Sequence, residues 1–466
     1  MSSRKRILLS EGSSLSSREA VTALGIAGHQ IGVCDPSPLC LGRFSRFVTH
    51  FYRCPPIGKD PKTYLDVVLD LLSSGHWDVL FPTHEQAFLF SRERARIPPG
   101  IGLAVADFQS FLQIQGKAAL VRTLERLSIP QPASCVIRTR EELLREHRFP
   151  FYLKADYATA STAVWRIHNA EELKSKCAEL ASGGLLQGDQ EFVVQESAKG
   201  ILERVQSVFD RGRLVAVHGY RQVAEGLNGG DIAKLSVTRP NVRDYVSRLG
   251  NELQWHGALS LDYILQEENQ VPIFIDANPR LVEPMNAVFS GVNLADILVR
   301  VSTGEAVTTA EPSGREVQTH MLLMALLSKA ASRSRRLDVI VELMGAIAGT
   351  GLYADGREEL LPVRTDFESL FPLAYVVTRL LLNPKSATAL SVGTINSYAL
   401  SPGRSTGNRG PRLDRSRSHD LVEDSRRSHD WLIGGMASNR PCGRRSWITS
   451  NPVTNSFNTP TRPSGP

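Results

Sequence analysis

The chain has 466 residues, of which 42% are hydrophobic and 22% are charged, an ordinary globular composition with room for two or three domains. Its formal net charge of +6 comes entirely from residues 401–466, which hold eleven arginines, no lysine and five acidic residues. The basic character of the whole chain therefore does not indicate nucleic-acid binding by residues 1–400.

Cysteine usage and hydropathy indicate a reducing compartment and no membrane segment. The six cysteines are scattered without C-x-x-C spacing, and the apolar run after Lys5 and Arg6 is too short for a signal peptide. No run approaches the roughly 18 apolar residues that a transmembrane helix requires. We therefore expect reduced thiols, a cytoplasmic protein and no membrane partner.

Residues 1–108 are expected to form an α/β domain with a parallel sheet. Residues 6–35 have the pattern of a strand, a Gly/Ser turn, an amphipathic helix and a second strand, and residues 78–90 have that of another strand and helix. The turn "SEGSSLSSREA" could cap the helix or bind a phosphate at its N-terminus. It lacks the G-x-G-x-x-G spacing, so the sequence favours capping, and we place no nucleotide site there.

Residues 109–305 are expected to form an α+β region. Residues 115–127 predict a helix that Pro130 and Pro132 terminate. Residues 149–181 then have the pattern of a strand, a small-residue loop, a second strand and a helix. The segments that follow alternate like the strands of an antiparallel sheet.

The rest of the chain divides into a mainly helical region, residues 306–400, and an Arg/Ser/Pro-rich tail, residues 401–466. The tail holds too little apolar surface to fold, so we expect it to be disordered. It could bind RNA as an arginine-rich arm, or it could be a solvated terminus. Few aromatic residues beyond Trp431 and Trp447 are interleaved in it, which favours the solvated terminus.

The stretches "GALSLDYIL" and "FIDANPR" predict two strands joined by a turn at "QEENQ". In the first strand, Asp262 lies on the face opposite the apolar residues Leu261 and Tyr263. In the second strand, Asp276 and Asn278 share a face. A turn centred on Asn269 would place Asp262 opposite Asp276, with about 4.5–5.5 Å between their Cβ atoms. Two carboxylates in that position repel each other unless a proton, water or a cation intervenes.

A divalent metal is one interpretation of this acidic hairpin, and a solvated polar face is the other. Two carboxylates and an amide oxygen suit magnesium, which leaves its other positions to water and phosphate. Arg280, two residues after Asn278, could bind the same phosphate bidentately. The local pattern alone does not decide between the two interpretations, because it assumes the strand register.

The hairpin, with "WHGAL" before it and "NLADILVRVSTGE" after it, resembles the metal-binding end of the ATP-grasp superfamily, in particular its carboxylate-amine ligase-like branch. The resemblance covers about residues 1–305. It implies an α/β N-terminal domain, residues 1–108, followed by two α+β ATP-grasp lobes in residues 109–305, with a hinge near residues 195–197. It also implies that ATP and Mg2+ are the cofactors, with Mn2+ able to substitute.

Two lysines match those that reach the ATP phosphates in this superfamily, Lys117 in "QGKAAL" and Lys154 in "YLKAD". Lys154 also ends an apolar run, where an unpaired ammonium would be costly. The loop after it, "DYATASTAV", has no glycine where many relatives have a glycine-rich lid. The hydroxyls of Ser161 and Thr162 could still contact phosphates, although the missing glycines limit close approach of the backbone.

The segment "FVVQESAKGILERVQSVF" resembles the superfamily's hinge and the strand that follows it. The resemblance implies that Gln195 accepts a hydrogen bond from the adenine amino group, and that the backbone near Glu196 and Ser197 contacts the adenine edge. It also implies that Glu203 accepts hydrogen bonds from the ribose hydroxyls.

The resemblance assigns the metal and the chemistry to the end of the hairpin. Asp262 and Asp276 fall in the two magnesium positions, which are usually Glu, and Asn278 would be the third ligand. Arg280 would lie near the transferred phosphate. Arg221, in "GYRQV", would hold the acceptor carboxylate or stabilise an acyl phosphate.

The implied activity is an ATP- and Mg2+-dependent ligation of a carboxylate to an amine or similar nucleophile through an acyl phosphate, with release of ADP and phosphate. One alternative, based on the glycine-less lid, is an ATP-binding protein of the same fold without ligase turnover. Another is an RNA-binding protein that acts through its arginine-rich tail. The expected partners are small-molecule carboxylate and amine substrates; we do not expect nucleic acid, and a homodimer is compatible with the sequence.

Overall fold

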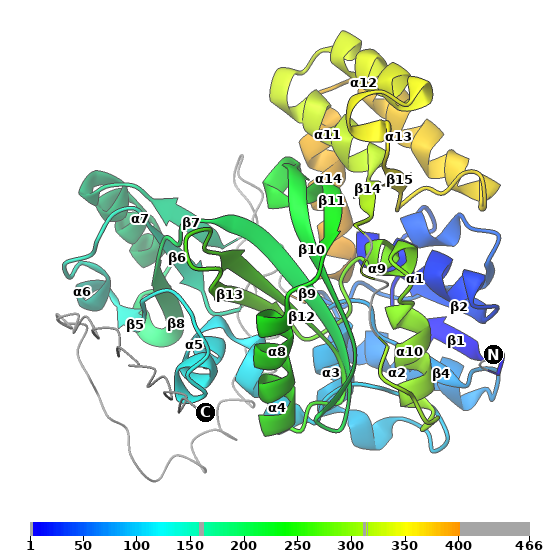
Figure 1. Ribbon diagram of the computed structural model, residues 1–466, viewed down its shortest axis with the longest axis horizontal. Coiled ribbons are helices and arrows are strands. Elements are labelled where there is room, and N and C mark those ends of the chain that lie inside the picture. Colours follow the sequence, from blue (N-terminus) through cyan, green and yellow to red (C-terminus); the bar gives the residue numbers. More distant parts are fainter. Residues whose placement is uncertain (1–2, 158–162, 311–313, 315, 401–466) are drawn as a thin grey trace, which may run out of the picture. The chain divides into compact units, whose positions relative to one another are not determined.

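Three β-sheets organise the residues described by the computed structural model, which are 3–157, 163–310, 314 and 316–400 (Figure 1). One sheet is formed by the N-terminal region and one by a smaller lobe. The third and largest sheet extends from the hairpin of residues 257–278 into the C-terminal region.

The first sheet is parallel and has the order β3-β2-β1-β4. Ser14 caps the first helix, because its side chain accepts a hydrogen bond of 3.0 Å from the Ser17 amide. The predicted parallel βαβ arrangement is confirmed, and so is the capping role of the serine turn. The elements are β1 (Arg6–Leu9), α1 (Leu15–Ile26), β2 (Gln30–Asp35), β3 (Val48–Arg53), α2 (Pro61–Ser73), β4 (Val79–Phe81) and α3 (Gln86–Arg92).

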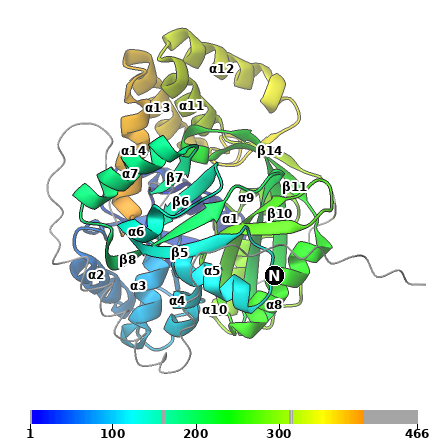
Figure 2. The same cartoon turned by 90° about the vertical axis from the view of Figure 1, so that its left-hand side faces the viewer.

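The second sheet is antiparallel, has the order β5-β8-β6-β7 and belongs to the lobe that faces the reader in Figure 2. Asn169 begins helix α7 by accepting hydrogen bonds from the amides of Glu171 and Glu172, and the apolar face of α7 contributes to the lobe's own core. The elements are α4 (Phe108–Gln115), α5 (Lys117–Arg126), β5 (Ser134–Thr139), α6 (Arg140–Leu143), β6 (Phe151–Ala155), β7 (Val164–Ile167), α7 (Ala170–Ser182) and β8 (Gln187–Glu196).

The third sheet has seven strands in the order β13-β12-β9-β10-β11-β14-β15. Its first five strands are antiparallel neighbours, as the alternating segments predict. The strands are β9 (Ile201–Asp210), β10 (Arg213–Glu225), β11 (Asp231–Val237), β12 (Gly257–Leu265), β13 (Pro272–Asn278), β14 (Gln318–His320) and β15 (Arg357–Glu358). The helices connected to them are α8 (Pro240–Glu252), α9 (Met285–Phe289) and α10 (Leu294–Ser302).

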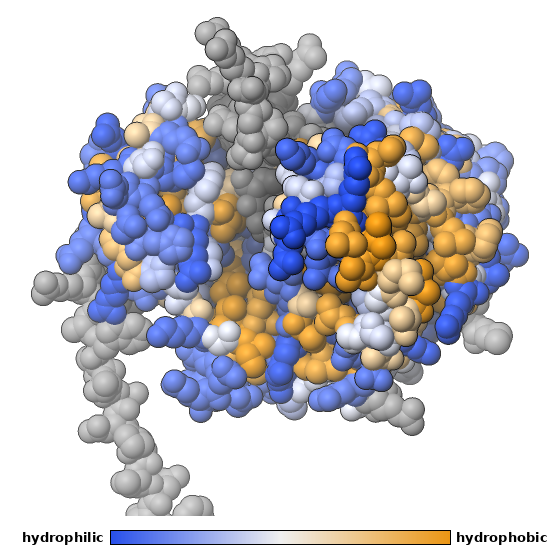
Figure 3. Space-filling model, turned by 90° about the horizontal axis from the view of Figure 1, so that it is seen from above, coloured by the Kyte–Doolittle hydropathy of each residue, from blue (hydrophilic) through white to orange (hydrophobic). Residues whose placement is uncertain are grey.

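The C-terminal region is mainly helical, as predicted, but it also supplies the edge strands β14 and β15 of the third sheet. Apolar residues gather on the surface that Figure 3 shows from above, the side on which α12 lies in Figure 1. Helix α12 leaves Leu337, Val341 and Ile347 more than half exposed. The helices are α11 (Leu322–Arg333), α12 (Arg336–Ala348), α13 (Leu370–Leu382) and α14 (Ser386–Tyr398).

A buried ion pair fastens the N-terminal region to the C-terminal region. The Arg18 guanidinium on α1 lies 2.9 Å from the Asp366 carboxylate, and neither side chain is exposed. Ser45 and the Arg46 amide also donate hydrogen bonds to Asp366. Apolar cores likewise include side chains from both the first and the third sheet. Within the described part of residues 3–400, the regions therefore pack as one unit.

Candidate functional site

The hairpin of β12 and β13 pairs Asp262 directly with Asp276 and Ser260 with Asn278. This is the register that a turn centred on Asn269 predicts. A bulge follows toward the turn, where Tyr263 pairs with Phe274. Because of the bulge, Phe274 packs against Tyr263 in the core while Asp276 stays on the opposite face with Asp262.

Basic side chains flank the two opposed carboxylates. The Lys117 ammonium lies 3.0 and 3.2 Å from the two Asp276 oxygens, and Arg204 Nε lies 3.4 Å from Asp262 Oδ1. Burial works to raise the pKa of Asp276, but Lys117 and Lys154 hold it below its ordinary value. Burial raises the pKa of Asp262, although Arg204 opposes the rise. The repulsion expected between the carboxylates is therefore compensated from both sides.

Both predicted lysines converge on β13. Lys117 is the first residue of α5, and Lys154 lies on β6, where its ammonium is almost buried and donates a hydrogen bond of 2.8 Å to the Ile275 carbonyl. Burial lowers the pKa of Lys154 to about 8, and the neighbouring Asp276 limits that fall. The structure thus brings together Lys117, Lys154, Asp262 and Asp276 from four different elements.

Asp156 fixes the geometry of these lysines, and the sequence analysis did not single it out. Its carboxylate accepts a hydrogen bond of 2.8 Å from the Ala118 amide, and its carbonyl accepts one of 3.2 Å from the Lys117 amide. A Cβ at Gly116 would lie 2.8 Å from this carboxylate, so glycine is required for the contact. The sequence could have pointed to Asp156 by its position, because it stands two residues after Lys154, at the end of a buried strand.

Arg280 connects the end of the hairpin to the N-terminal region. Its guanidinium lies 3.4 Å from the Asn278 side-chain oxygen and 3.3 Å from the Ser16 hydroxyl on α1. Burial lowers the pKa of Arg280, and Tyr398 and Glu85 oppose this effect. Arg280 and Asn278 therefore face the same pocket as the carboxylate pair.

Gln195 lies at the end of β8, beside both lysines. Its side chain is buried, donates a hydrogen bond of 3.2 Å to the Ser134 hydroxyl and lines a small space together with Lys117 and Lys154. Glu196 closes β8 through a hydrogen bond from its amide to the Ala133 carbonyl, and Ser197 begins the connection to β9. The expected hinge segment is thus next to the lysines.

Glu203 and Arg221 lie together on the other face of the third sheet, away from Asp262. Glu203 lies opposite Tyr263, and neighbouring residues of a strand point to opposite faces, so its side chain is on the face away from Asp262. There the fully buried Glu203 carboxylate accepts hydrogen bonds from Arg221 at 3.2 Å, Arg239 at 2.8 Å and the Tyr263 hydroxyl at 2.9 Å. These hydrogen bonds connect β9, β10 and β12 to the start of α8.

A pocket of about 670 Å³ opens beside the carboxylate pair. Its charged end is lined by Lys117, Arg204, Asp262, Asp276, Asn278 and Arg280. Its other end lies between the N-terminal loops and the C-terminal helices and is apolar, lined by Leu41, Phe44, Leu323, Leu327, Phe371 and Tyr375. The volume is typical of a pocket for a small-molecule ligand.

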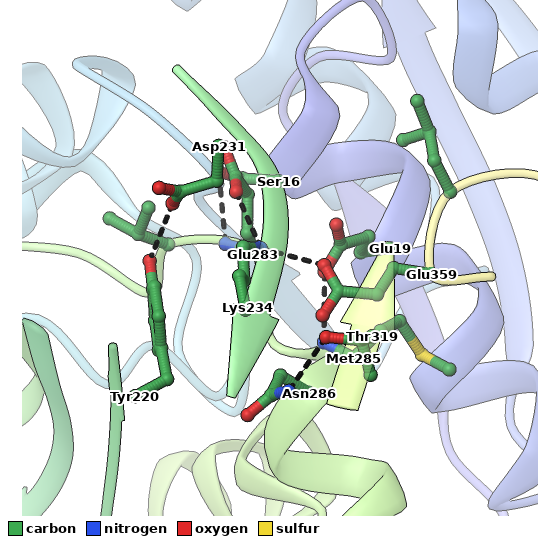
Figure 4. A network of polar contacts seen from close by, with 12 residues as sticks. Ser16, Glu19, Tyr220, Asp231, Lys234, Glu283, Met285, Asn286, Thr319 and Glu359 are labelled. Atoms are coloured by element: carbon green, nitrogen blue, oxygen red, sulfur yellow. Dashed lines mark hydrogen bonds and ion pairs between the residues drawn. The ribbon is translucent and has the colours of Figure 1, made fainter. Parts of the chain in front are cut away.

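A buried polar network adjoins the pocket and joins three regions of the chain (Figure 4). Lys234 on β11 lies 2.7 Å from Glu283 and 2.6 Å from Glu359. Burial works to lower the pKa of Lys234, but the two carboxylates hold it well above its ordinary value. Glu19 of α1 accepts a hydrogen bond of 2.8 Å from the Met285 amide, and burial raises the pKa of Glu19 well above its ordinary value.

Two of the predicted phosphate-contacting residues, Ser161 and Thr162, lie outside the described residues, as does the rest of the segment 158–162. Within the described part of the chain, no helix is long and apolar enough to cross a membrane.

Comparison with curated proteins finds a partial relative. No protein-family model matches the chain. Over 221 residues it is 28% identical to the large chain of carbamoyl phosphate synthase from Thermus thermophilus. The match covers 44% of this chain and 21% of that protein, so the chain corresponds to about a fifth of the relative's length.

Solved structures match more of the chain. The carboxyaminoimidazole ribonucleotide synthase of Aspergillus clavatus, solved with ATP, is 13% identical with a TM-score of 0.56, over 81% of this chain and 99% of that chain. The L-amino acid ligase of Bacillus licheniformis is 14% identical with a TM-score of 0.55, over 69% and 81% of the two chains. These proteins have the ATP-grasp fold, and this chain shares that fold.

Proposed function

We propose that this chain is an ATP- and Mg2+-dependent ligase that joins a carboxylate to an amine, or to a similar nucleophile, through an acyl phosphate. The observation that carries the proposal is the convergence of Lys117 and Lys154 on the strand of Asp276, with Asp262 directly opposite. The solved neighbours, a synthase in complex with ATP and an amino acid ligase, support the same class of reaction. ADP and phosphate are the expected by-products.

The donor set at the end of the hairpin fits magnesium. Asp262, Asp276 and Asn278 offer only oxygen, and they share one face. The described residues contain no group of three or more His, Cys, Asp or Glu side chains that could hold a metal ion by themselves. Magnesium commonly uses one or two carboxylates and completes its shell with water and substrate phosphates, so this smaller set is sufficient. Manganese accepts the same ligands and could substitute.

The nucleotide would be held by the lysines and the hinge. Lys117 forms an ion pair with Asp276 in the structure, and metal binding to that carboxylate would release the ammonium for a phosphate. Lys154 would neutralise a second phosphate oxygen from its fixed position on β6. Gln195 and the backbone of Glu196 and Ser197 would contact the adenine.

The proposed chemistry has two steps. An oxygen of the substrate carboxylate attacks the γ-phosphorus, and the bond from that phosphorus to ADP breaks. The amine nitrogen then attacks the acyl carbon, the bond to phosphate breaks with its electron pair, and the nitrogen loses a proton. Arg280 would form charge-assisted hydrogen bonds to the phosphoryl group during both steps. The protein contributes positioning and charge stabilisation.

The direct test is to incubate the protein with ATP, Mg2+ and pooled carboxylates and amines, and to analyse nucleotides and products by mass spectrometry. We expect ADP, phosphate and a ligated product whose formation requires both pools. AMP and pyrophosphate would contradict the proposal, because they indicate adenylation of the carboxylate instead of phosphorylation. Omitting each pool in turn separates ligation from simple ATP hydrolysis.

Measuring ATP affinity beside product formation distinguishes the ligase from an ATP-binding protein without turnover. In that case ATP would bind with the same affinity to the wild type and to Asp276→Ala, and neither protein would form product. The glycine-less segment "DYATASTAV" is the sequence feature that motivates this alternative.

A further inference from the structure

We propose that the carboxylate substrate carries an apolar chain or ring, which packs between the N-terminal loops and the C-terminal helices while its carboxylate faces Arg280. This inference rests on the proposed ligase function, and it concerns the apolar end of the pocket, which the nucleotide and metal assignments leave unused.

The charged residues that line the pocket belong to the N-terminal region, α5 and the third sheet with the loop that follows the hairpin, and none belongs to the C-terminal helices. They are Glu85, Lys117, Arg204, Asp231, Asp262, Asp276, Arg280 and Glu283. The lining side chains that α11, α13 and α14 contribute include no charged residue. A small polar acid such as bicarbonate would occupy the charged end alone and leave the apolar wall in contact with water.

The apolar wall is a continuous surface built by two distant parts of the chain. Leu41 of the N-terminal region packs against the same apolar cluster as Leu323 and Leu327 of α11, both of which are buried. The rings of Phe44 and Phe371 approach to 6.2 Å between centroids, one from each side. The wall is therefore formed by packed side chains on α11 and the N-terminal loops, and it can present a fixed shape to a ligand.

The two ends of the pocket together define the chemistry of the ligand. An acid that places its carboxylate beside Arg280 directs the rest of the molecule along the pocket, toward Phe371. Burying an apolar group there removes its surface from water, which stabilises the complex by an amount that grows with each methylene. An amphipathic carboxylic acid satisfies both ends, whereas a uniformly polar or uniformly apolar molecule satisfies only one.

The test measures binding and turnover along a series of straight-chain acids, from acetate to decanoate, with the full-length protein. Affinities are measured by calorimetry in the presence of Mg2+ and ADP, and turnover is measured as ADP release with ATP and pooled amines. We expect the dissociation constant to fall by about fourfold for each added methylene, until the pocket is filled. Equal affinity across the series would overturn the inference.

A matched pair of variants locates the effect in the pocket. Phe371 and Phe367 are both more than half exposed, but only Phe371 lines the pocket. Phe371→Ser should weaken the binding of the longest acids by about five- to tenfold and leave acetate and ATP unaffected. Phe367→Ser should behave like the wild type. An unchanged chain-length dependence in Phe371→Ser would contradict the assignment of this wall.

Failure of this inference differs from failure of the proposed function. Turnover without dependence on chain length would retain the ligase and remove the apolar substrate. Graded binding of the acids without any turnover would retain the apolar site and remove the ligase. The absence of both binding and turnover would contradict both proposals.

Discussion

At the level of single residues, the face on which a strand presents its side chain decides which candidate residues can act together. Within the hairpin, the alternation of side chains and the short turn were enough to place Asp262 opposite Asp276. The register between β9 and β12 could not be predicted in this way, because a long stretch of chain separates them. That register places Glu203 opposite Tyr263, on the face away from Asp262.

Replacing one of the opposed carboxylates tests the metal assignment. We expect Asp276→Asn to lower ligase turnover by about two orders of magnitude or more, because a neutral amide binds magnesium less well than a carboxylate does. Turnover is measured as ADP release at saturating Mg2+. Asp244→Asn is the matched control, since Asp244 is exposed on α8. Unchanged turnover in Asp276→Asn would exclude Asp276 as a metal ligand.

At the level of elements, the parts that could be predicted are those with a local signal. The serine cap of α1, the helix that begins at Lys117 and the two strands of the hairpin all follow from spacing over a few residues. Strands β14 and β15 were not predicted because they have only three and two residues, which is too short for an alternating pattern. Sheet order and the buried contacts of α1 depend on distant segments and have no local signal.

The contact of Glu19 on α1 with the first residue of α9, Met285, gives a test at this scale. The folded-state pKa of Glu19 lies above its ordinary value, so the folded protein holds a proton that the unfolded chain has released. Folding stability contributed by Glu19 is therefore full at low pH and is lost as the pH rises toward the folded-state pKa. The glutamine of Glu19→Gln cannot ionise, so this variant should lose less folding stability as the pH rises. Its side-chain oxygen can still accept a hydrogen bond from the Met285 amide.

The measurement is the free energy of unfolding in urea, at about pH 6 and about pH 9, because linkage is read from the difference between them. Glu19→Gln should be at least as stable as the wild type at the higher pH. Glu19→Ala should lose about 1–3 kcal/mol at both pH values, because the buried Met285 amide is left without an acceptor. Identical pH dependence in the wild type and Glu19→Gln would contradict the argument.

At the level of the whole molecule, the charge distribution separates the tail from the site. Residues 401–466 account for the entire net charge, and all of the candidate site lies before them. The composition predicted this separation, since charge can be counted without knowledge of the fold. The pocket between the N-terminal loops and the C-terminal helices could not be predicted, because its walls come from segments far apart in the sequence.

Deletion of residues 401–466 tests whether the tail takes part in the activity. We expect the truncated protein to bind ATP with an affinity within about twofold of the full-length chain, because every residue of the candidate site lies before residue 401 and salt screens the charges of exposed side chains. Fluorescence titration with an ATP analogue provides the measurement. If the protein instead acts by binding RNA through its arginines, deletion would abolish the RNA complex in a filter-binding assay, and that activity would require the tail.

The ion pair of Arg18 with Asp366 also limits how early the N-terminal region can fold stably during translation. The two partners are 348 positions apart, so α1 emerges from the ribosome long before the carboxylate that neutralises its buried guanidinium. A buried charge without its partner costs about 3–5 kcal/mol, a large fraction of the stability of a typical domain. The N-terminal region therefore cannot reach its final stability until nearly all of residues 1–400 have been translated.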